Sequence, residues 1–188
     1  MHCETLQQPP REYYGLLGLE RRLSLSNQEL QQRFYDLTRR LHPDRFMRSS
    51  ERERQYSLDG SSLLNDAYRT LRDPVKRAMY VLGQEGFEVG EQRSKDVPPE
   101  LLEEVFELNM ALEEIRTGDD SVRGQLEKAE HNFTNLLSEV DGQLEGLFSQ
   151  YDEGRSRDTL TQIRAALNRR KYIQNLVDEV HKTLSPSS

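Results

Sequence analysis

The sequence of 188 residues contains no tryptophan, a single cysteine, 11 glycines and 7 prolines. Because Cys3 is alone, the chain cannot form an intramolecular disulfide or a cysteine-based zinc site. The four histidines, His2, His42, His131 and His181, lack the spacing of metal ligands. The sequence also has no glycine-rich phosphate loop, Ser/His/Asp set or paired-carboxylate pocket. We therefore predict a protein that needs no metal or cofactor and is not an enzyme.

Long apolar runs and an excess of positive charge are absent as well. No segment approaches the roughly 20 apolar residues that cross a bilayer, and the N-terminal residues lack the apolar core of a secretory signal. The net charge of −7 argues against a chain that coats nucleic acid or an anionic membrane. The segment with Arg33, Arg39 and Arg40 also holds Glu29 and Asp36, which argues against a helix that reads base edges. We expect a soluble cytoplasmic protein with no nucleic-acid or membrane partner.

Helical periodicity dominates the first half of the chain, and no alternating strand pattern interrupts it. Four helices are predicted there, over residues 12–19, 26–41, 51–71 and 74–82. Ser26 and Glu29 form the S-x-x-E pattern of a capping box. Asp73 followed by Pro74 is typical of an N-cap and the first helical position. A polar loop is expected between the second and third helices.

Apolar residues in the second half recur at alternating spacings of four and three. They predict helices over residues 98–116, 122–151 and 156–184, joined by short turns. Short turns make neighbouring helices antiparallel, so an antiparallel three-helix bundle is expected. The fold class is therefore all-α. We divide the chain into a flexible tail over residues 1–10, a first domain over 11–89, a linker over 90–97 and the bundle over 98–188.

The sharpest motif is the tripeptide His42-Pro43-Asp44, placed between the two helices of a hairpin. Alone, it could be a proline-terminated helix whose aspartate caps the loop. Its context is more specific, because a short helix over Tyr13–Leu19 precedes it and an Ala-Tyr-x-x-Leu pattern at Ala67–Leu71 follows it. This arrangement resembles a J domain. The first domain is thus expected to be a J-domain helical hairpin.

The resemblance implies that the chain binds a DnaK-type chaperone ATPase and stimulates its ATP hydrolysis. Pro43 stiffens the loop, which lowers the entropy lost on docking, and Asp44 offers a carboxylate suited to a partner arginine. The implied chaperone-binding residues are His42, Pro43, Asp44, Arg33, Arg40 and Arg45. An alternative for Arg33 and Arg40 is that they pair with Asp36 on their own helix.

Several stretches are similar to the HscB subfamily of J-domain co-chaperones, which serves iron–sulfur cluster assembly. They are residues 42–46, 65–68, 71–82 and 86–87. Tyr35-Asp36 stands where general J domains often carry a Lys-Arg pair, which favours a specialised HscA-type chaperone over a general DnaK. The resemblance also implies that the bundle delivers an IscU-type scaffold protein to that chaperone.

The helix over residues 98–116 has more apolar residues than one stripe requires. Leu102, Phe106 and Met110 recur every four residues, offset from the core stripe and flanked by glutamates, which is typical of a partner site. Alternatively, this strip packs on the J domain or on the helix over residues 156–184. The resemblance implies a client-binding set of Leu102, Phe106, Glu107, Met110, Glu114 and Tyr172, in which Met110 stands where an acidic residue is expected.

These observations lead to one principal hypothesis and two alternatives. We predict a non-enzymatic co-chaperone that stimulates an HscA/DnaK-type ATPase and delivers an IscU-type scaffold to it. The first alternative is a J-domain co-chaperone that serves a different client. The second is a small all-helical enzyme or metal carrier, which an ATPase assay of the protein alone and a metal analysis would detect.

Overall fold

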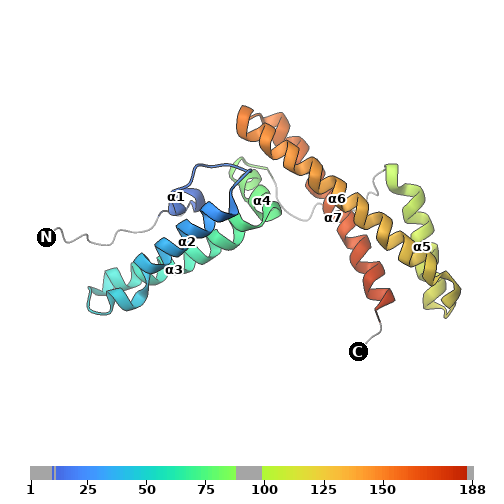
Figure 1. Cartoon of the computed structure of the whole chain (residues 1–188), viewed down its shortest axis with the longest axis horizontal. Helices are drawn as coiled ribbons and strands as arrows, with labels where there is room; N and C mark the ends of the chain where they lie inside the picture. The colour runs from blue at the N-terminus through green and yellow to red at the C-terminus, as the bar shows by residue number, and fades with distance from the viewer. Residues whose placement is uncertain (1–9, 11, 88–98, 186–188) are drawn as a thin grey trace. The chain divides into compact units, whose positions relative to one another are not determined.

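The computed structural model describes residues 10, 12–87 and 99–185 (Figure 1). The regular elements of these residues are α-helices with short 3-10 turns, and none is a strand, so the all-α prediction is confirmed. The predicted linker over residues 90–97 lies outside the described residues, as does the predicted tail except for Pro10. Cys3 and His2 also lie outside them.

The chain forms two compact units, Met1–Phe87 and Glu88–Ser188, which are described separately. Unit 1 contains α1 (Tyr13–Leu17), α2 (Asn27–Leu41), a 3-10 turn (Pro43–Phe46), α3 (Glu51–Arg72) and α4 (Pro74–Gln84). Its core is a set of fully buried apolar side chains, which includes Tyr14, Leu23, Leu30, Leu64, Leu71 and Leu82.

Local signals set most helix boundaries in unit 1. The Glu12 carboxylate accepts hydrogen bonds from the first amides of α1, and Gly18, with φ of 64°, ends that helix. The first helix is therefore shorter than the predicted 12–19. Asp73 caps α4 through the amides of Val75 and Lys76, as predicted.

One signal that the sequence analysis did not use begins α3. Ser50 and Glu53 form a reciprocal capping box in which each side chain binds the backbone amide of the other. At the predicted box of α2, the Ser26 hydroxyl accepts from the Glu29 amide at 3.3 Å. The expected polar loop after α2 contains the 3-10 turn over Pro43–Phe46.

Two side chains of α4 connect it to the rest of unit 1. Arg77 is 5% exposed, and its guanidinium donates to the backbone carbonyls of Leu23 and Leu71. Tyr80 stacks on Tyr13 with ring centroids 4.5 Å apart, and its hydroxyl accepts from the Tyr13 amide at 3.0 Å. These contacts attach α4 to the ends of α1 and α3, although α4 has only 11 residues.

Unit 2 contains a 3-10 turn (Pro99–Leu101), α5 (Leu102–Arg116), a second turn (Asp120–Val122), α6 (Arg123–Gly154) and α7 (Arg157–Leu184). The predicted helix over 98–116 therefore begins later, after a 3-10 turn that contains Pro99. Helices α6 and α7 form a long antiparallel hairpin, and α5 lies along α6 (Figure 1).

Ion pairs link the three helices of unit 2 at their surface. Arg170 on α7 makes a two-pronged contact with Asp141 on α6. Arg116 at the end of α5 reaches Glu179 on α7 at 3.0 Å. The bundle is thus held by polar contacts at its surface and by a buried apolar core, which includes Leu112, Leu126, Phe133, Ile163 and Ile173. The all-α arrangement of a hairpin-based unit and a helical bundle agrees with the predicted fold.

Candidate chaperone and client surfaces

The His42-Pro43-Asp44 corner begins where α2 ends. Pro43 excludes the helical conformation from the residue before it, and His42 accordingly has φ of −59° and ψ of 128°. The His42 ring then turns back, and its Nδ1 accepts a hydrogen bond from the Asp44 amide at 3.3 Å. The His42 carbonyl accepts from the Arg45 amide at 3.0 Å. The corner is therefore a short, locally hydrogen-bonded turn.

The Asp44 carboxylate is exposed beside the His42 ring. Its Oδ2 lies 3.6 Å from His42 Nδ1, and the side chain is 76% exposed. This separation is too long for a hydrogen bond between the two side chains. The site thus presents one exposed anion on a turn whose backbone is fixed.

The last carbonyl of α2 is fixed by two serines that the sequence analysis missed. Ser57 Oγ donates to the Leu41 carbonyl at 2.6 Å, and Ser61 Oγ donates to the same oxygen at 3.2 Å. Ser57 is fully buried, and both serines lie on α3. Their spacing of four residues places both on one helix face, but serine within a helix is not by itself a signal for such a contact.

The basic residues expected beside the corner are exposed, and their contacts differ from the proposed pairing. Arg33 lies 4.0 Å from Glu29 rather than pairing with Asp36. Arg40 forms no ion pair with any residue that the structure describes. Arg45 donates to the backbone carbonyl of Arg39 at 3.3 Å. Among the described residues, none of these three cations is therefore held in a close ion pair.

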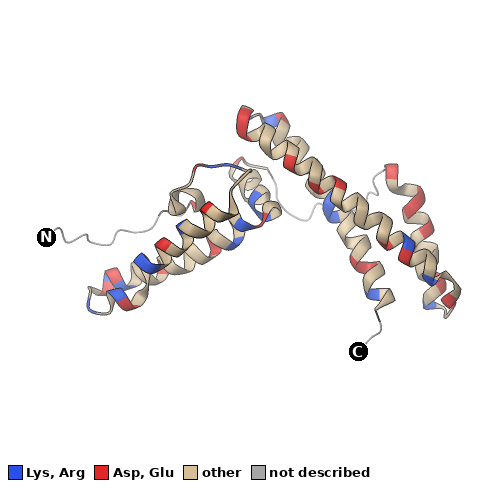
Figure 2. Cartoon of the chain, in the orientation of Figure 1, with Lys and Arg blue, Asp and Glu red and all other residues tan. Residues whose placement is uncertain are grey.

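The apolar strip of α5 lies in solvent. Leu102 is 55% exposed, Phe106 65% and Met110 50%, whereas Val105, Leu108 and Leu112 of the same helix are buried. The strip is therefore separate from the core stripe, and the alternative in which it packs on α7 does not hold. Five glutamates lie on the same helix, and Figure 2 shows acidic residues along its length.

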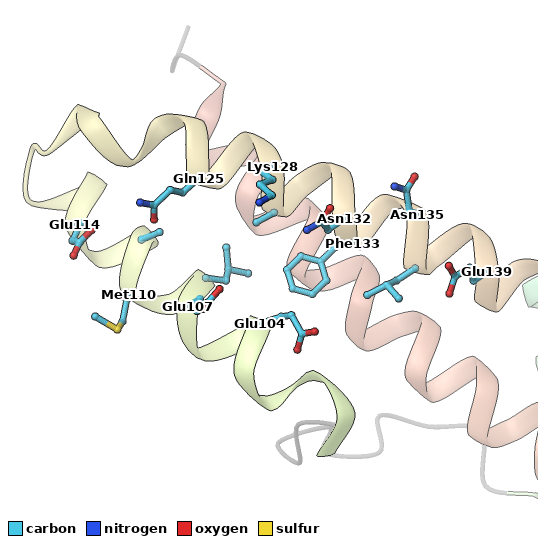
Figure 3. A pocket seen from close by; sticks show the side chains of 14 residues that line it. Glu104, Glu107, Met110, Glu114, Gln125, Lys128, Asn132, Phe133, Asn135 and Glu139 are labelled. Atoms are coloured by element: carbon cyan, nitrogen blue, oxygen red, sulfur yellow. The ribbon is translucent and has the colours of Figure 1, made fainter.

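The structure gathers only part of the expected client-binding set. Glu107, Met110 and Glu114 line a groove of about 800 Å³ between α5 and α6 (Figure 3). Leu102 and Phe106 are not among its lining residues. Tyr172 lies on α7, half-buried, and burial raises the pKa of its phenol above the ordinary value of 10.0. The α6 wall of this groove was missed by the sequence analysis, because periodicity does not reveal which faces of two helices border a groove.

Among the described residues, no cluster of three or more His, Cys, Asp or Glu side chains could hold a metal ion. None of the helices there is long and apolar enough to cross a membrane.

Comparison with known proteins supports a two-part chain. Residues 12–80 match the family model of the DnaJ domain. Residues 97–181 match the family model described as the HSCB C-terminal oligomerisation domain. The first matched segment lies within unit 1, and the second lies within unit 2.

Relatives similar over most of the chain are co-chaperones. The iron–sulfur cluster co-chaperone protein HscB of Mus musculus is 29% identical over 98% of this chain and 75% of its own length. The human protein of that name is 29% identical over 95% of this chain and 72% of its own. A co-chaperone protein HscB homolog of Vibrio vulnificus is 40% identical over 58% of this chain and 64% of its own. All three are named as co-chaperones rather than as enzymes.

Solved structures resemble the whole chain as well. The crystal structure of human co-chaperone protein HscB matches with a TM-score of 0.74 and 27% identity, over 98% of this chain and 89% of that one. Chaperone HscB from Vibrio cholerae matches with a TM-score of 0.64 and 29% identity, over 91% of this chain and 96% of that one. The similarity therefore extends across both units.

Proposed function

Because this chain belongs to the HscB-type J-domain co-chaperones of iron–sulfur cluster assembly, we propose that it stimulates the ATPase of an HscA/DnaK-type chaperone and delivers an IscU-type scaffold protein to it. The proposal assigns the chaperone to unit 1 and the client to unit 2. A reducing compartment such as the cytoplasm suits a chain with a single cysteine.

The observation that carries the chaperone half is the exposed carboxylate of Asp44 on a fixed turn. A preorganised loop loses little entropy on docking, and an exposed carboxylate can accept both prongs of a partner arginine. The nearby cations Arg33, Arg40 and Arg45 supply positive charge for an acidic chaperone surface. Electrostatic complementarity of this kind raises the association rate and fixes orientation.

Substitution of Asp44 tests the chaperone half. Asp44→Asn keeps the shape of the side chain and removes its charge, and a charged hydrogen bond contributes roughly 1.5–3 kcal/mol. We expect stimulation of the partner ATPase to fall at least tenfold, with an unchanged circular dichroism spectrum. Asp66→Asn, on an exposed position of α3, is the matched control and should leave stimulation intact. Full stimulation by the Asp44 variant would refute the proposed mechanism.

The exposed strip of α5 supports the client half. Three large apolar side chains that are half or more exposed, beside glutamates of the same helix, form the kind of surface that a partner covers. Phe106→Ala should abolish binding of an IscU-type scaffold to the full chain, as measured by calorimetry. Leu58→Ala is the control, because Leu58 is 53% exposed but lies on α3. A scaffold that binds the Phe106 variant and the unaltered chain equally well would contradict this assignment.

The same pair of assays distinguishes the proposed function from the alternative of a different client. If the chain stimulates the chaperone ATPase but the unaltered protein does not bind the scaffold, the J-domain half stands and the client must be another protein. Hydrolysis of ATP by the chain alone would instead favour the enzyme hypothesis.

A further inference from the structure

We propose that the groove between α5 and α6 is a docking site for a positively charged amphipathic helix of the client, with α6 as its second wall. The proposed function assigns client contact to the exposed strip of α5, and it gives α6 no role. The identification of the partner as the client rests on the proposed function.

The groove has an apolar floor built from both helices. Leu108 and Ala111 contribute from α5, and Ala129, Phe133 and Leu136 contribute from α6. These residues are spaced at three and four along their helices, so each set forms one stripe. Leu108, Phe133 and Ala111 are buried and form the base of the groove. Ala129 and Leu136 are only partly buried, so they are the apolar floor residues that a guest can contact without rearrangement of the core.

The walls carry a marked excess of negative charge. Glu104, Glu107 and Glu114 line the α5 side, and Glu139 lines the α6 side, against the single cation Lys128. Within the described part of the chain, none of these four carboxylates forms an ion pair. The groove therefore has a formal charge of about −3, which no ion pair among the described residues neutralises.

Two arginines of the bundle pair with glutamates that do not line the groove. Arg116 pairs with Glu113 and Glu179, and Arg169 pairs with Glu100 at 3.6 Å. Glu113 and Glu100 thus have partners, whereas the four glutamates that line the groove form no ion pair among the described residues. The charge of the groove is therefore available to an external cation, and it selects a basic occupant over an acidic one.

The dimensions of the groove suit a helix. Glu104 and Glu114 are ten residues apart on α5, which corresponds to about 15 Å at 1.5 Å per residue. Gln125 and Glu139 span about 21 Å on α6 by the same measure. Three to four turns of a guest helix would cover this length. Figure 3 shows Asn132 and Asn135 on the α6 side of the groove, where amides can bond to a polar edge of the guest.

Met110 is the residue at the border of the two surfaces. It belongs to the exposed strip and also lines the groove. Methionine adapts its shape to different apolar partners. At the position where the family resemblance predicts an acidic residue, a thioether extends the apolar surface of the strip into the groove. A client held on the strip can therefore place an adjoining helix on the floor.

The test uses the full chain and two synthetic peptides of 18 residues. One peptide carries leucines at helical spacing flanked by lysines, and the other carries glutamates in place of the lysines. Binding of fluorescent peptide is measured by anisotropy at low salt and again at higher salt. Asn132→Lys with Asn135→Lys adds two positive charges to the α6 wall. Thr134→Lys with Ser138→Lys is the matched control, because it adds the same charges at exposed α6 positions that do not line the groove.

The lysine peptide should bind the unaltered chain and the control variant within a factor of two of each other. The groove variant should bind about fivefold more weakly, because two exposed like-charge contacts are added. Binding should weaken at higher salt, and the glutamate peptide should not bind. An equal loss in both variants, absence of binding, or equal binding of the glutamate peptide would overturn the proposal. Self-association of the unaltered chain that the groove variant abolishes would also overturn it, since the occupant would then be a second copy.

This assay contains neither the chaperone nor the scaffold. A failure of the Phe106→Ala experiment would therefore leave the peptide result unchanged, and a failure of the peptide experiment would leave the strip assignment unchanged.

Discussion

The carbonyl of Leu41 offers a direct test of how the corner after α2 is held in place. Its oxygen accepts hydrogen bonds from Ser57 Oγ at 2.6 Å and from Ser61 Oγ at 3.2 Å. The last carbonyls of a helix have no intrahelical donor and must be satisfied from outside. Because His42 follows directly, these two bonds fix the point from which the turn departs. We predict that they position Asp44 for the chaperone.

The cost of removing each hydroxyl follows from its geometry and burial. Ser57→Ala removes the shorter bond at a fully buried position, and we expect a loss of about 1 kcal/mol in the free energy of unfolding. Ser61→Ala removes the longer bond while Ser57 still satisfies the oxygen, so about 0.5 kcal/mol is expected. The double variant leaves the oxygen without either donor. Its loss should exceed the sum of the single losses and reach roughly 2–3 kcal/mol, which is the signature of two donors that compensate for one another.

The functional readout separates positioning from stability. A turn that is no longer fixed must be ordered on docking, so the co-chaperone concentration for half-maximal ATPase stimulation should rise about fivefold in the double variant. The maximal stimulation should change little, because Asp44 itself is intact. Ala67→Gly is the matched control, since it weakens a buried position of α3 by about 1 kcal/mol without touching the corner. It should leave the half-maximal concentration unchanged.

Two results would refute this reasoning. Additive losses in urea denaturation would show that the two serines do not share one acceptor in solution. A half-maximal concentration that rises equally in the Ala67→Gly variant would show that stability alone, rather than the position of the turn, controls docking.

Three other predictions concern residues that stabilise the folds of unit 1 and unit 2. Arg77→Met deprives two backbone carbonyls of a buried donor, and urea denaturation should show a loss of about 2–3 kcal/mol. Arg170→Lys replaces a two-pronged contact with Asp141 by a single one, and the loss of about 0.5 kcal/mol should disappear in 1 M salt. Burial, as the largest cause, raises the pKa of Tyr80 above 10.0, so folding favours the protonated phenol. The contribution of Tyr80 to the free energy of unfolding is complete below pH 10, and it is lost as the pH rises through the folded-state pKa of its phenol. Thermal melting from pH 9 to 11 should therefore show a decline that is smaller in Tyr80→Phe, although Tyr172 retains its own share.

Features governed by one or two residues were predictable from the sequence. The end of α2 at Leu41 follows from the steric effect of Pro43 on His42, which needs no tertiary contact. The start of α4 follows from the side chain of Asp73 and the fixed φ of the proline after it. The periodic apolar residues of unit 2 likewise predicted three helices, because a helix must bury one stripe regardless of its neighbours.

Features that depend on two elements at once were not predictable. Ser57 is polar, yet it is fully buried, since its acceptor belongs to α2 and lies 16 residues away in the sequence. The α6 wall of the groove depends on how α6 is rotated about its axis relative to α5. That rotation is set by the turn between them, where Gly118 has φ of 96° and Asp119 caps a 3-10 turn. Periodicity within either helix contains no information about this angle.

The exposed strip of α5 is the intermediate case, and it explains why the binding experiments can be interpreted. Its three apolar residues were recognised as surplus because the core stripe was already complete, and their exposure agrees with that count. A side chain that remains in solvent contributes little to the free energy of folding. Phe106→Ala should therefore leave the unfolding transition of the bundle almost unchanged, so a loss of client binding in that variant would report on the interface alone. Truncation of Leu108 on the same helix would not allow this inference, because Leu108 is 2% exposed and also forms part of the groove floor.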